Sequence, residues 1–316
     1  MTRKKIIAAV VLAAGVLSLA AVLLVGALAP AGGEGDSIYA ANRPAVGVIE
    51  INGMIVTGRS SGSLFGGALA GSQTITAQLR QVAKNPRIKA VVLRINSPGG
   101  TPAAAQEISD EVVRLKKQGV KVVASMGDVA ASGAYWIASS ADSIVANPGT
   151  ITGSIGVIME TNNYRGLYDK LGIEGRTFKS GSYKDMGSSS RPVSAEEANI
   201  FQSMVDDIYQ QFIDTVAGNR KLSPEAIRQL NGRVITGRQA VNTGLADRLG
   251  GFYDAVSLAG EISGLGRDPG LVSLEQKRQW WQLLEDLESS IGPVRFDLST
   301  PGGQAGVLLI SPPAGN

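Results

Sequence analysis

Neither cysteine nor histidine occurs anywhere in the 316-residue chain. The lack of cysteine excludes disulfides, thiolate nucleophiles and Cys-x-x-Cys redox chemistry, and the lack of both residue types excludes zinc sites built from their side chains. A Ser-His-Asp triad is excluded as well, because no imidazole is present to act as the base. Acid–base chemistry must therefore use Asp, Glu, Lys or Tyr.

The chain also has little excess of charge of either sign. Its 30 basic residues exceed its 27 acidic residues by three, and Arg3, Lys4 and Lys5 account for that excess. The remainder is formally neutral, so the composition gives no support for binding nucleic acid. Forty glycines and few aromatic residues indicate many tight turns and close backbone approaches.

One long apolar run extends from Ile6 to Ala29. Its 24 residues would span about 36 Å as a helix, against roughly 30 Å of bilayer hydrocarbon. A cleaved secretory signal is the alternative, since residues 27–29 resemble a cleavage site, but the run exceeds the usual signal core of about 7–15 residues. The sequence therefore predicts a membrane anchor within residues 1–29, with its basic N-terminus in the cytoplasm and the rest of the chain outside the cytoplasmic membrane.

After a linker at 30–44, the sequence alternates between strand and helix patterns. Strands are expected at 46–51, 88–95, 121–125 and 143–146, and helices near 103–118, 224–230 and 238–249. A turn is expected at Gly127-Asp128, before the segment 130–140. This alternation predicts an α/β fold with largely parallel strands over residues 45–265. Residues 266–316 form a C-terminal extension that we expect to be partly disordered.

A long amphipathic helix is predicted over residues 194–220. Ser194 precedes Glu197 by three residues, which is a capping-box pattern. The apolar stripe along this helix consists of Phe201, Met204, Val205, Ile208, Phe212 and Val216. Such a stripe indicates either core packing or a contact between subunits.

Three segments carry candidate chemical groups. Gly99 and Gly100 end a predicted strand and open into a helix, so their N–H groups can form an oxyanion hole, although the same pattern is common in ordinary tight turns. Ser132, followed by Gly133, lies at a strand-to-helix junction, where a serine is most often a simple N-cap. Lys184 lies in a Gly/Ser-rich loop, where most lysines are solvated. A lysine withdrawn from water can nevertheless act as a base, and without histidine it is the best partner for a serine nucleophile.

Together these segments resemble the signal peptide peptidases of the SppA type, which are membrane-anchored serine proteases with a Ser-Lys dyad. The resemblance rests on INSPGG at 95–100, ASGAYW at 131–136, TGSIGV at 152–157 and SGSYKDMGS at 180–188. The separation of 52 residues between Ser132 and Lys184 also suits this family. Lys170 and Lys179 are nearby alternatives, but neither lies in the matching motif.

The resemblance implies a fold and a role for each matched residue. The fold is that of Clp protease and crotonase, built from repeated ββα units. Ser132 is then the nucleophile and Lys184 the general base, the amides of Gly133 and of Gly99 or Gly100 form the oxyanion hole, and Ser154 holds the lysine by a hydrogen bond.

Further expectations follow from the same resemblance. No cofactor is implied, the substrates are apolar peptides such as signal-peptide remnants, and the chain forms a homo-oligomer, an octamer, in which the dyad can be completed across a subunit boundary. Because the base must be neutral, activity should rise with pH. A crotonase-type acyl-CoA enzyme shares the fold, but an extracytoplasmic location argues against it. A catalytically silent scaffold remains the alternative, and a serine-directed covalent probe distinguishes the two.

Overall fold

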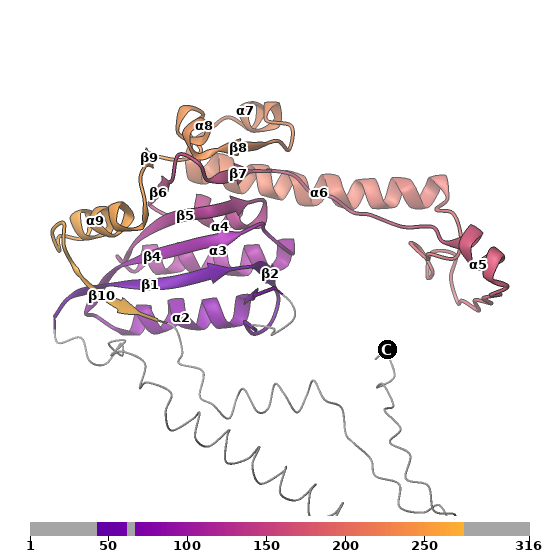
Figure 1. Ribbon diagram of the computed structural model, residues 1–316, viewed down its shortest axis with the longest axis horizontal. Coiled ribbons are helices and arrows are strands. Elements are labelled where there is room, and N and C mark those ends of the chain that lie inside the picture. Colours follow the sequence, from indigo (N-terminus) through magenta and orange to yellow (C-terminus); the bar gives the residue numbers. More distant parts are fainter. Residues whose placement is uncertain (1–42, 62–66, 275–316) are drawn as a thin grey trace, which may run out of the picture. The chain divides into compact units, whose positions relative to one another are not determined.

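The computed structural model describes residues 43–61 and 67–274 of the chain (Figure 1). The predicted anchor at 6–29, most of the linker and most of the C-terminal extension lie outside these ranges. Within them, no helix combines the length and the apolar character needed to cross a membrane.

The strands of the described chain form one large and one small sheet. They are β1 (Ala45–Asn52), β2 (Met54–Val56), β3 (Leu69–Gly71), β4 (Ile88–Ser97), β5 (Lys121–Ala131), β6 (Ser143–Ala146), β7 (Ile151–Gly153), β8 (Val234–Thr236), β9 (Arg248–Leu249) and β10 (Gly270–Ser273). The large sheet has the order β10-β1-β4-β5-β6-β9, with β7 paired to β5 and β8 to β7, whereas β2 and β3 pair with each other. All pairs are parallel except β7–β8. The prediction of a largely parallel α/β sheet is confirmed, and β10 adds a strand beyond residue 265.

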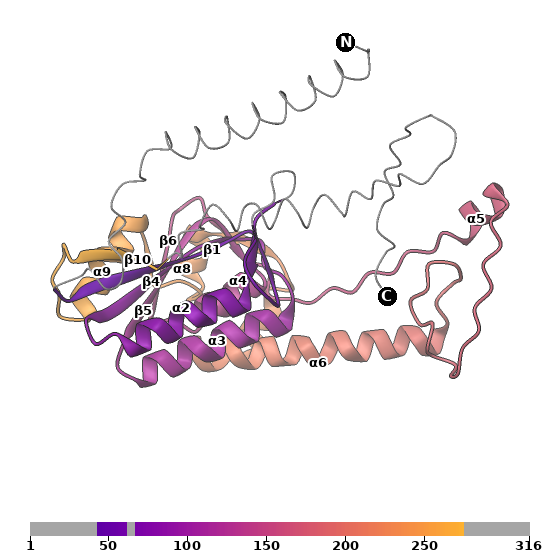
Figure 2. The same cartoon turned by 90° about the horizontal axis from the view of Figure 1, so that it is seen from below.

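Helices cover both faces of the large sheet. They are α2 (Ser72–Lys84), α3 (Pro102–Lys117), α4 (Gly133–Ser139), α5 (Arg165–Leu171), α6 (Ala195–Arg220), α7 (Pro224–Gln229), α8 (Gly237–Asn242) and α9 (Phe252–Ile262). Figure 2 shows α2, α3 and α4 side by side against one face. On β4, Val91 and Leu93 pack in the core under these helices, while Ala90 and Val92 pack with α9 on the other face. Burial on both faces explains why this strand is an almost continuous apolar run.

Strand β5 differs from its prediction in a way that affects the site. It continues through the expected turn at Gly127-Asp128 to Ala131. The pairing of β4 with β5 shifts register after Ile95, and the side chain of Asn96 accepts a hydrogen bond from the Val129 amide at 3.1 Å. This side chain replaces a missing backbone partner, so β5 stays extended as far as the residue before Ser132.

Helix α6 packs against the body of the protein only through its C-terminal part. Phe212, Ile213 and Val216 are buried there, and Asn219 donates a 3.0 Å hydrogen bond to the hydroxyl of Ser140. Towards its N-terminus the predicted apolar stripe is only half-buried at Phe201, Val205 and Ile208, and Met204 is 45% exposed. Figure 1 shows α6 leaving the sheet, with α5 at its far end. Core packing therefore explains only the second half of the stripe.

Candidate active site

Ser132 occupies a strained turn between β5 and α4. Its backbone has φ 54° and ψ −124°, a left-handed conformation that non-glycine residues rarely adopt. The turn is held on both sides, because the Ser132 amide donates to the Gly153 carbonyl at 2.9 Å and the Ser132 carbonyl accepts from the Trp136 amide at 3.0 Å. Although Ser132 is at the N-cap position of α4, its hydroxyl makes no capping hydrogen bond. The hydroxyl is therefore available for another role.

Gly99 and Gly100 lie directly against this turn, where no other residue type fits. Gly99 has φ +105°, and a Cβ on it would lie 2.9 Å from both the Cβ of Ser132 and the amide nitrogen of Gly133. A Cβ on Gly100 would lie 1.8 Å from the carbonyl oxygen of Ile55. The Ile55 backbone fixes the glycine turn by donating to the Gly99 carbonyl at 2.8 Å and accepting from the Thr101 amide at 2.9 Å. Glycine at both positions lets the two backbone segments meet.

Two free amides result from this close approach. A Cβ on Gly133 would lie 3.3 Å from the amide nitrogen of Gly100, so the two residues are neighbours in space. Within the described part of the chain, neither the Gly100 nor the Gly133 amide donates a hydrogen bond. The Gly99 amide, in contrast, donates to the hydroxyl of Ser97 at 3.1 Å. A pair of unpaired N–H groups beside a serine is suited to binding an oxyanion.

Ser154 is also fixed next to the Ser132 turn. It follows Gly153, whose carbonyl accepts the Ser132 amide, and its own amide donates to the Arg233 carbonyl at 2.9 Å. Like Ser132, it has a positive φ, of 50°. The structure thus brings together Ser132, Ser154 and the glycine amides that the sequence predicted as site residues.

Lys184 is not part of this group within one chain. It is an exposed residue of the segment between α5 and α6, which Figure 1 shows at the end of α6 remote from the sheet. The next residue, Asp185, is joined through Arg191 to Glu197 in the first turn of α6, whereas Phe212 stacks on Trp136 near Ser132. Fifteen residues of helix between Glu197 and Phe212 correspond to about 22 Å. This distance is well beyond the reach of a lysine side chain.

The charged groups around Lys184 form a tight cluster. Hydrogen bonds from Arg191, and secondarily from Lys179, hold the pKa of the Asp185 carboxyl well below its usual range. Hydrogen bonds from Arg191 and then from the Ser194 amide lower the pKa of Glu197 to about 2. Both carboxylates therefore stay ionised throughout the neutral range.

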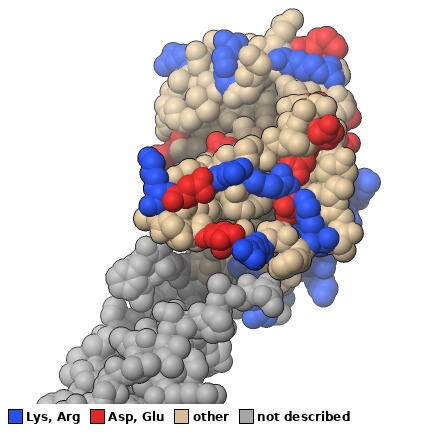
Figure 3. Space-filling model, turned by 90° about the vertical axis from the view of Figure 1, so that its right-hand side faces the viewer, with Lys and Arg blue, Asp and Glu red and all other residues tan. Residues whose placement is uncertain are grey.

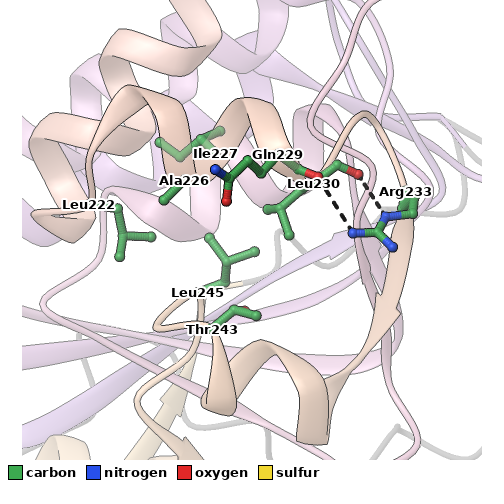
Figure 4. Close-up of a pocket in the computed structure, with 8 residues that line it drawn as sticks. All are labelled: Leu222, Ala226, Ile227, Gln229, Leu230, Arg233, Thr243 and Leu245. Carbon is green, nitrogen blue, oxygen red and sulfur yellow. Dashed lines mark hydrogen bonds between the residues drawn. The ribbon is translucent and has the colours of Figure 1, made fainter.

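A separate cavity of about 300 Å³ lies between α7 and α8 (Figure 4). Its walls are mostly apolar and include Leu222, Ile227, Leu230 and Leu245, with Arg233 at one side. In Figure 4 the Arg233 guanidinium turns back to the carbonyls of the preceding helix. The polar lining of the cavity also includes Thr243, whose hydroxyl donates to the carbonyls of Gln239 and Ala240 at 3.0 and 3.2 Å. The described part of the chain also contains no cluster of acidic side chains that could hold a metal ion.

Sequence reasoning missed three residues that shape this site. Ile55 and Gly153 act through their backbones, which leave no signal in side-chain patterns. Arg191 holds Asp185 and Glu197 together. The capping-box pattern at 194–197 indicated a role for Glu197 but gave no sign of its pairing with Arg191.

Comparisons with known proteins agree with this geometry. The family model of peptidase family S49 matches residues 114–265, and that of Clp protease matches residues 69–148. A Synechocystis protein that is named as a protease is 42% identical over 211 residues. The match covers 66% of this chain and 75% of that protein. An Enterococcus faecium protein named for signal peptide peptidase SppA is 38% identical, covering 66% of this chain and 60% of that protein. Protease 4 of Salmonella typhi is 38% identical over 70% of this chain, which spans 35% of that longer protein.

Proposed function

Because the chain belongs to peptidase family S49 and is a serine protease with a Clp-protease-like fold, we propose that Ser132 is its nucleophile and Lys184 its general base. The observation that carries the proposal is the Ser132 turn with the two free amides of Gly100 and Gly133 beside it. Serine nucleophiles commonly lie on strained strand-to-helix turns that expose their hydroxyl.

The proposed reaction proceeds through an acyl-enzyme. Neutral Lys184 Nζ takes the proton of the Ser132 hydroxyl as Oγ attacks the scissile carbonyl carbon. The Gly100 and Gly133 amides stabilise the oxyanion, and one such donor is worth about 2.7–4 kcal/mol of barrier in a well-studied protease. The lysine then protonates the leaving amine, and water hydrolyses the serine ester.

We further propose that Lys184 acts on the Ser132 of a second copy of the chain. Within the described residues, the Lys184 ammonium and the hydroxyls of Ser132 and Ser154 make no hydrogen bond. The segment between β7 and α6 also exposes large apolar side chains, among them Ile158 at 86% and Phe178 at 93%. Such a concentration on one segment marks an interaction surface. Docking of this segment on a neighbouring subunit covers the apolar side chains and delivers the lysine, with Ser154 as its hydrogen-bond partner.

The substrate class is proposed from the resemblance to the SppA-type peptidases, and the location from the apolar segment near the N-terminus. We propose that the apolar segment at 6–29 anchors the protease to the cytoplasmic membrane with its protease domain outside, where apolar peptides such as signal-peptide remnants are released. Figure 3 shows acidic and basic side chains intermixed on the face at the α5 end, without the single-sign surface that binding to nucleic acid requires.

A serine-directed phosphonate probe tests the assignment. The full-length chain in detergent is treated with the probe as wild type, Ser132→Ala and Lys184→Ala, and hydrolysis of an apolar fluorogenic peptide is followed in parallel. We expect labelling and cleavage in the wild type alone. Labelling that persists in Ser132→Ala would place the nucleophile elsewhere.

A further inference from the structure

A single arginine joins the Lys184 loop to helix α6. Arg191 Nε and Nη2 donate to the two carboxylate oxygens of Asp185 at 3.0 and 2.8 Å. The same guanidinium donates through Nη1 to Glu197 Oε2 at 2.9 Å and through Nη2 to Glu197 Oε1. The side chains of Asp185 and Glu197 are only 13% and 3% exposed. One planar group thus fixes two largely buried carboxylates at once.

The two carboxylates connect the proposed base to a rigid element. Asp185 directly follows Lys184, and Glu197 lies in the first turn of the 26-residue helix α6. The other end of that helix packs against Trp136, on the helix that begins after Ser132. Lys179 adds a further contact to Asp185, at 2.7 Å.

Helix capping alone does not explain these contacts. Ser194 and Glu197 already complete a capping box, since the Ser194 hydroxyl accepts from the Glu197 amide and the Glu197 carboxylate accepts from the Ser194 amide. Arg191 is not needed for that arrangement, and its bonds to Asp185 lie outside it. The Lys184 side chain is exposed and has no hydrogen-bond partner in the described chain. Its position therefore depends on the backbone turn at 181–187, in which the Lys184 amide donates to the Gly181 carbonyl at 3.2 Å.

We propose that Arg191 is a positioning residue for catalysis, which clamps Asp185 to Glu197 and so fixes the turn that presents Lys184 to the serine of a second copy. This inference rests on the proposed function. Catalysis is sensitive to small displacements, and a shift of about 1 Å in a reacting group can cost about 100-fold in rate. Lysine in place of Arg191 lacks the planar fork that serves both carboxylates.

The test uses the full-length protein in detergent and measures kcat, KM and oligomer mass. We expect Arg191→Met to lower kcat by about 10- to 100-fold, with little change in KM and the same mass, and Arg191→Lys to recover part of the loss. Arg267→Met is the control, because Arg267 pairs with Glu261 on α9, outside the segment between β7 and α6, and its side chain is 84% exposed. Its kinetics should equal those of the wild type.

A double-mutant cycle separates positioning from general structural damage. The activity of Lys184→Ala is measured with a small primary amine in solution that replaces the missing base. Introducing Arg191→Met into this variant should not lower kcat further. Asp185→Asn keeps the Arg191–Glu197 pair and should reproduce the drop in kcat. If Arg191→Met changes the oligomer mass, Asp185→Asn is the variant that tests the positioning role. An unchanged kcat in Asp185→Asn would overturn the inference. So would an Arg191→Met change that lowers kcat equally in the presence and in the absence of Lys184. Full activity in Lys184→Ala would instead refute the proposed function itself.

Discussion

The rings of Trp136 and Phe212 stack with their centroids 4.6 Å apart and their planes at 18°. Trp136 lies four residues after Ser132, and Phe212 lies in the buried half of α6. This contact fixes α6, which follows the Lys184 loop, to α4, which follows Ser132. With the length of α6 between Phe212 and Glu197, it holds the proposed base away from the proposed nucleophile of the same chain, which supports the proposal of catalysis between chains.

Phe212→Ala should destabilise the protein. Removing a buried aromatic ring costs about 3–5 kcal/mol of the free energy of unfolding, and chemical denaturation measures the loss. Tyr253→Ala is the control, because Tyr253 is 76% exposed, and it should change the free energy of unfolding by less than about 0.5 kcal/mol. Equal effects of the two changes would show that the stack does not anchor α6.

Gly99→Ala should remove activity. The added Cβ would lie 2.9 Å from the Cβ of Ser132, so it must displace the turn that carries the proposed nucleophile. We expect peptide hydrolysis to fall by about 100-fold or more. Gly119 offers a matched control, since it also has a positive φ, of +89°, but nothing lies within 4 Å of its missing Cβ. Gly119→Ala should cost about 1–2 kcal/mol of stability from backbone strain alone and leave kcat unchanged.

Phe178→Ala should weaken the assembly without weakening the fold. The Phe178 side chain is 93% exposed in the single chain, so it contributes little to the stability of that chain. We expect a lower oligomer mass by light scattering and a matching fall in activity, both restored at higher protein concentration. An unchanged mass at every concentration would exclude Phe178 from the subunit contact.

The ion pairs of Arg191 predict a defined response to acid. The Glu197 pKa of about 2 in the folded chain lies below its unfolded value of about 4.3, and that of Asp185 is lowered by the same arginine. Because both values are depressed, the stabilisation is complete above about pH 4.3 and is lost as the pH falls towards about 2. Melting temperatures of the wild type and Arg191→Met should therefore differ at neutral pH and converge towards pH 2. A difference that disappears on raising the pH would contradict this assignment.

Much of the fold could be predicted from the sequence. The apolar runs around β1 and β4 and the capping box of α6 are local signals, and the structure confirms the elements they predict. The prediction of a turn at Gly127-Asp128 was wrong. The side chain of Asn96, 33 positions before Val129 in the sequence, accepts the Val129 amide and keeps β5 extended. Neighbours of that kind leave no mark on local periodicity.

The parts of the site that could not be predicted depend on distant backbone contacts. Proximity of Gly99, Gly100 and Gly133 follows from the pairing of Ile55 with the glycine turn. Residue patterns suggested two amides but did not distinguish Gly99 from Gly100. The Ser97 hydroxyl makes that distinction by occupying the Gly99 amide. Nor does any sequence pattern show that α6 carries Lys184 away from its own Ser132.

Mixing two inactive variants tests most directly the claim that the dyad is shared between chains. Ser132→Ala and Lys184→Ala are prepared as full-length proteins, dissociated, combined and reassembled, and peptide hydrolysis is compared with that of each variant alone. If Lys184 of one chain serves Ser132 of another, the mixture contains intact pairs and regains a fraction of wild-type activity that depends on the mixing ratio. Co-assembly that is proven by mass but restores no activity would contradict the account and place both residues of the dyad in one chain.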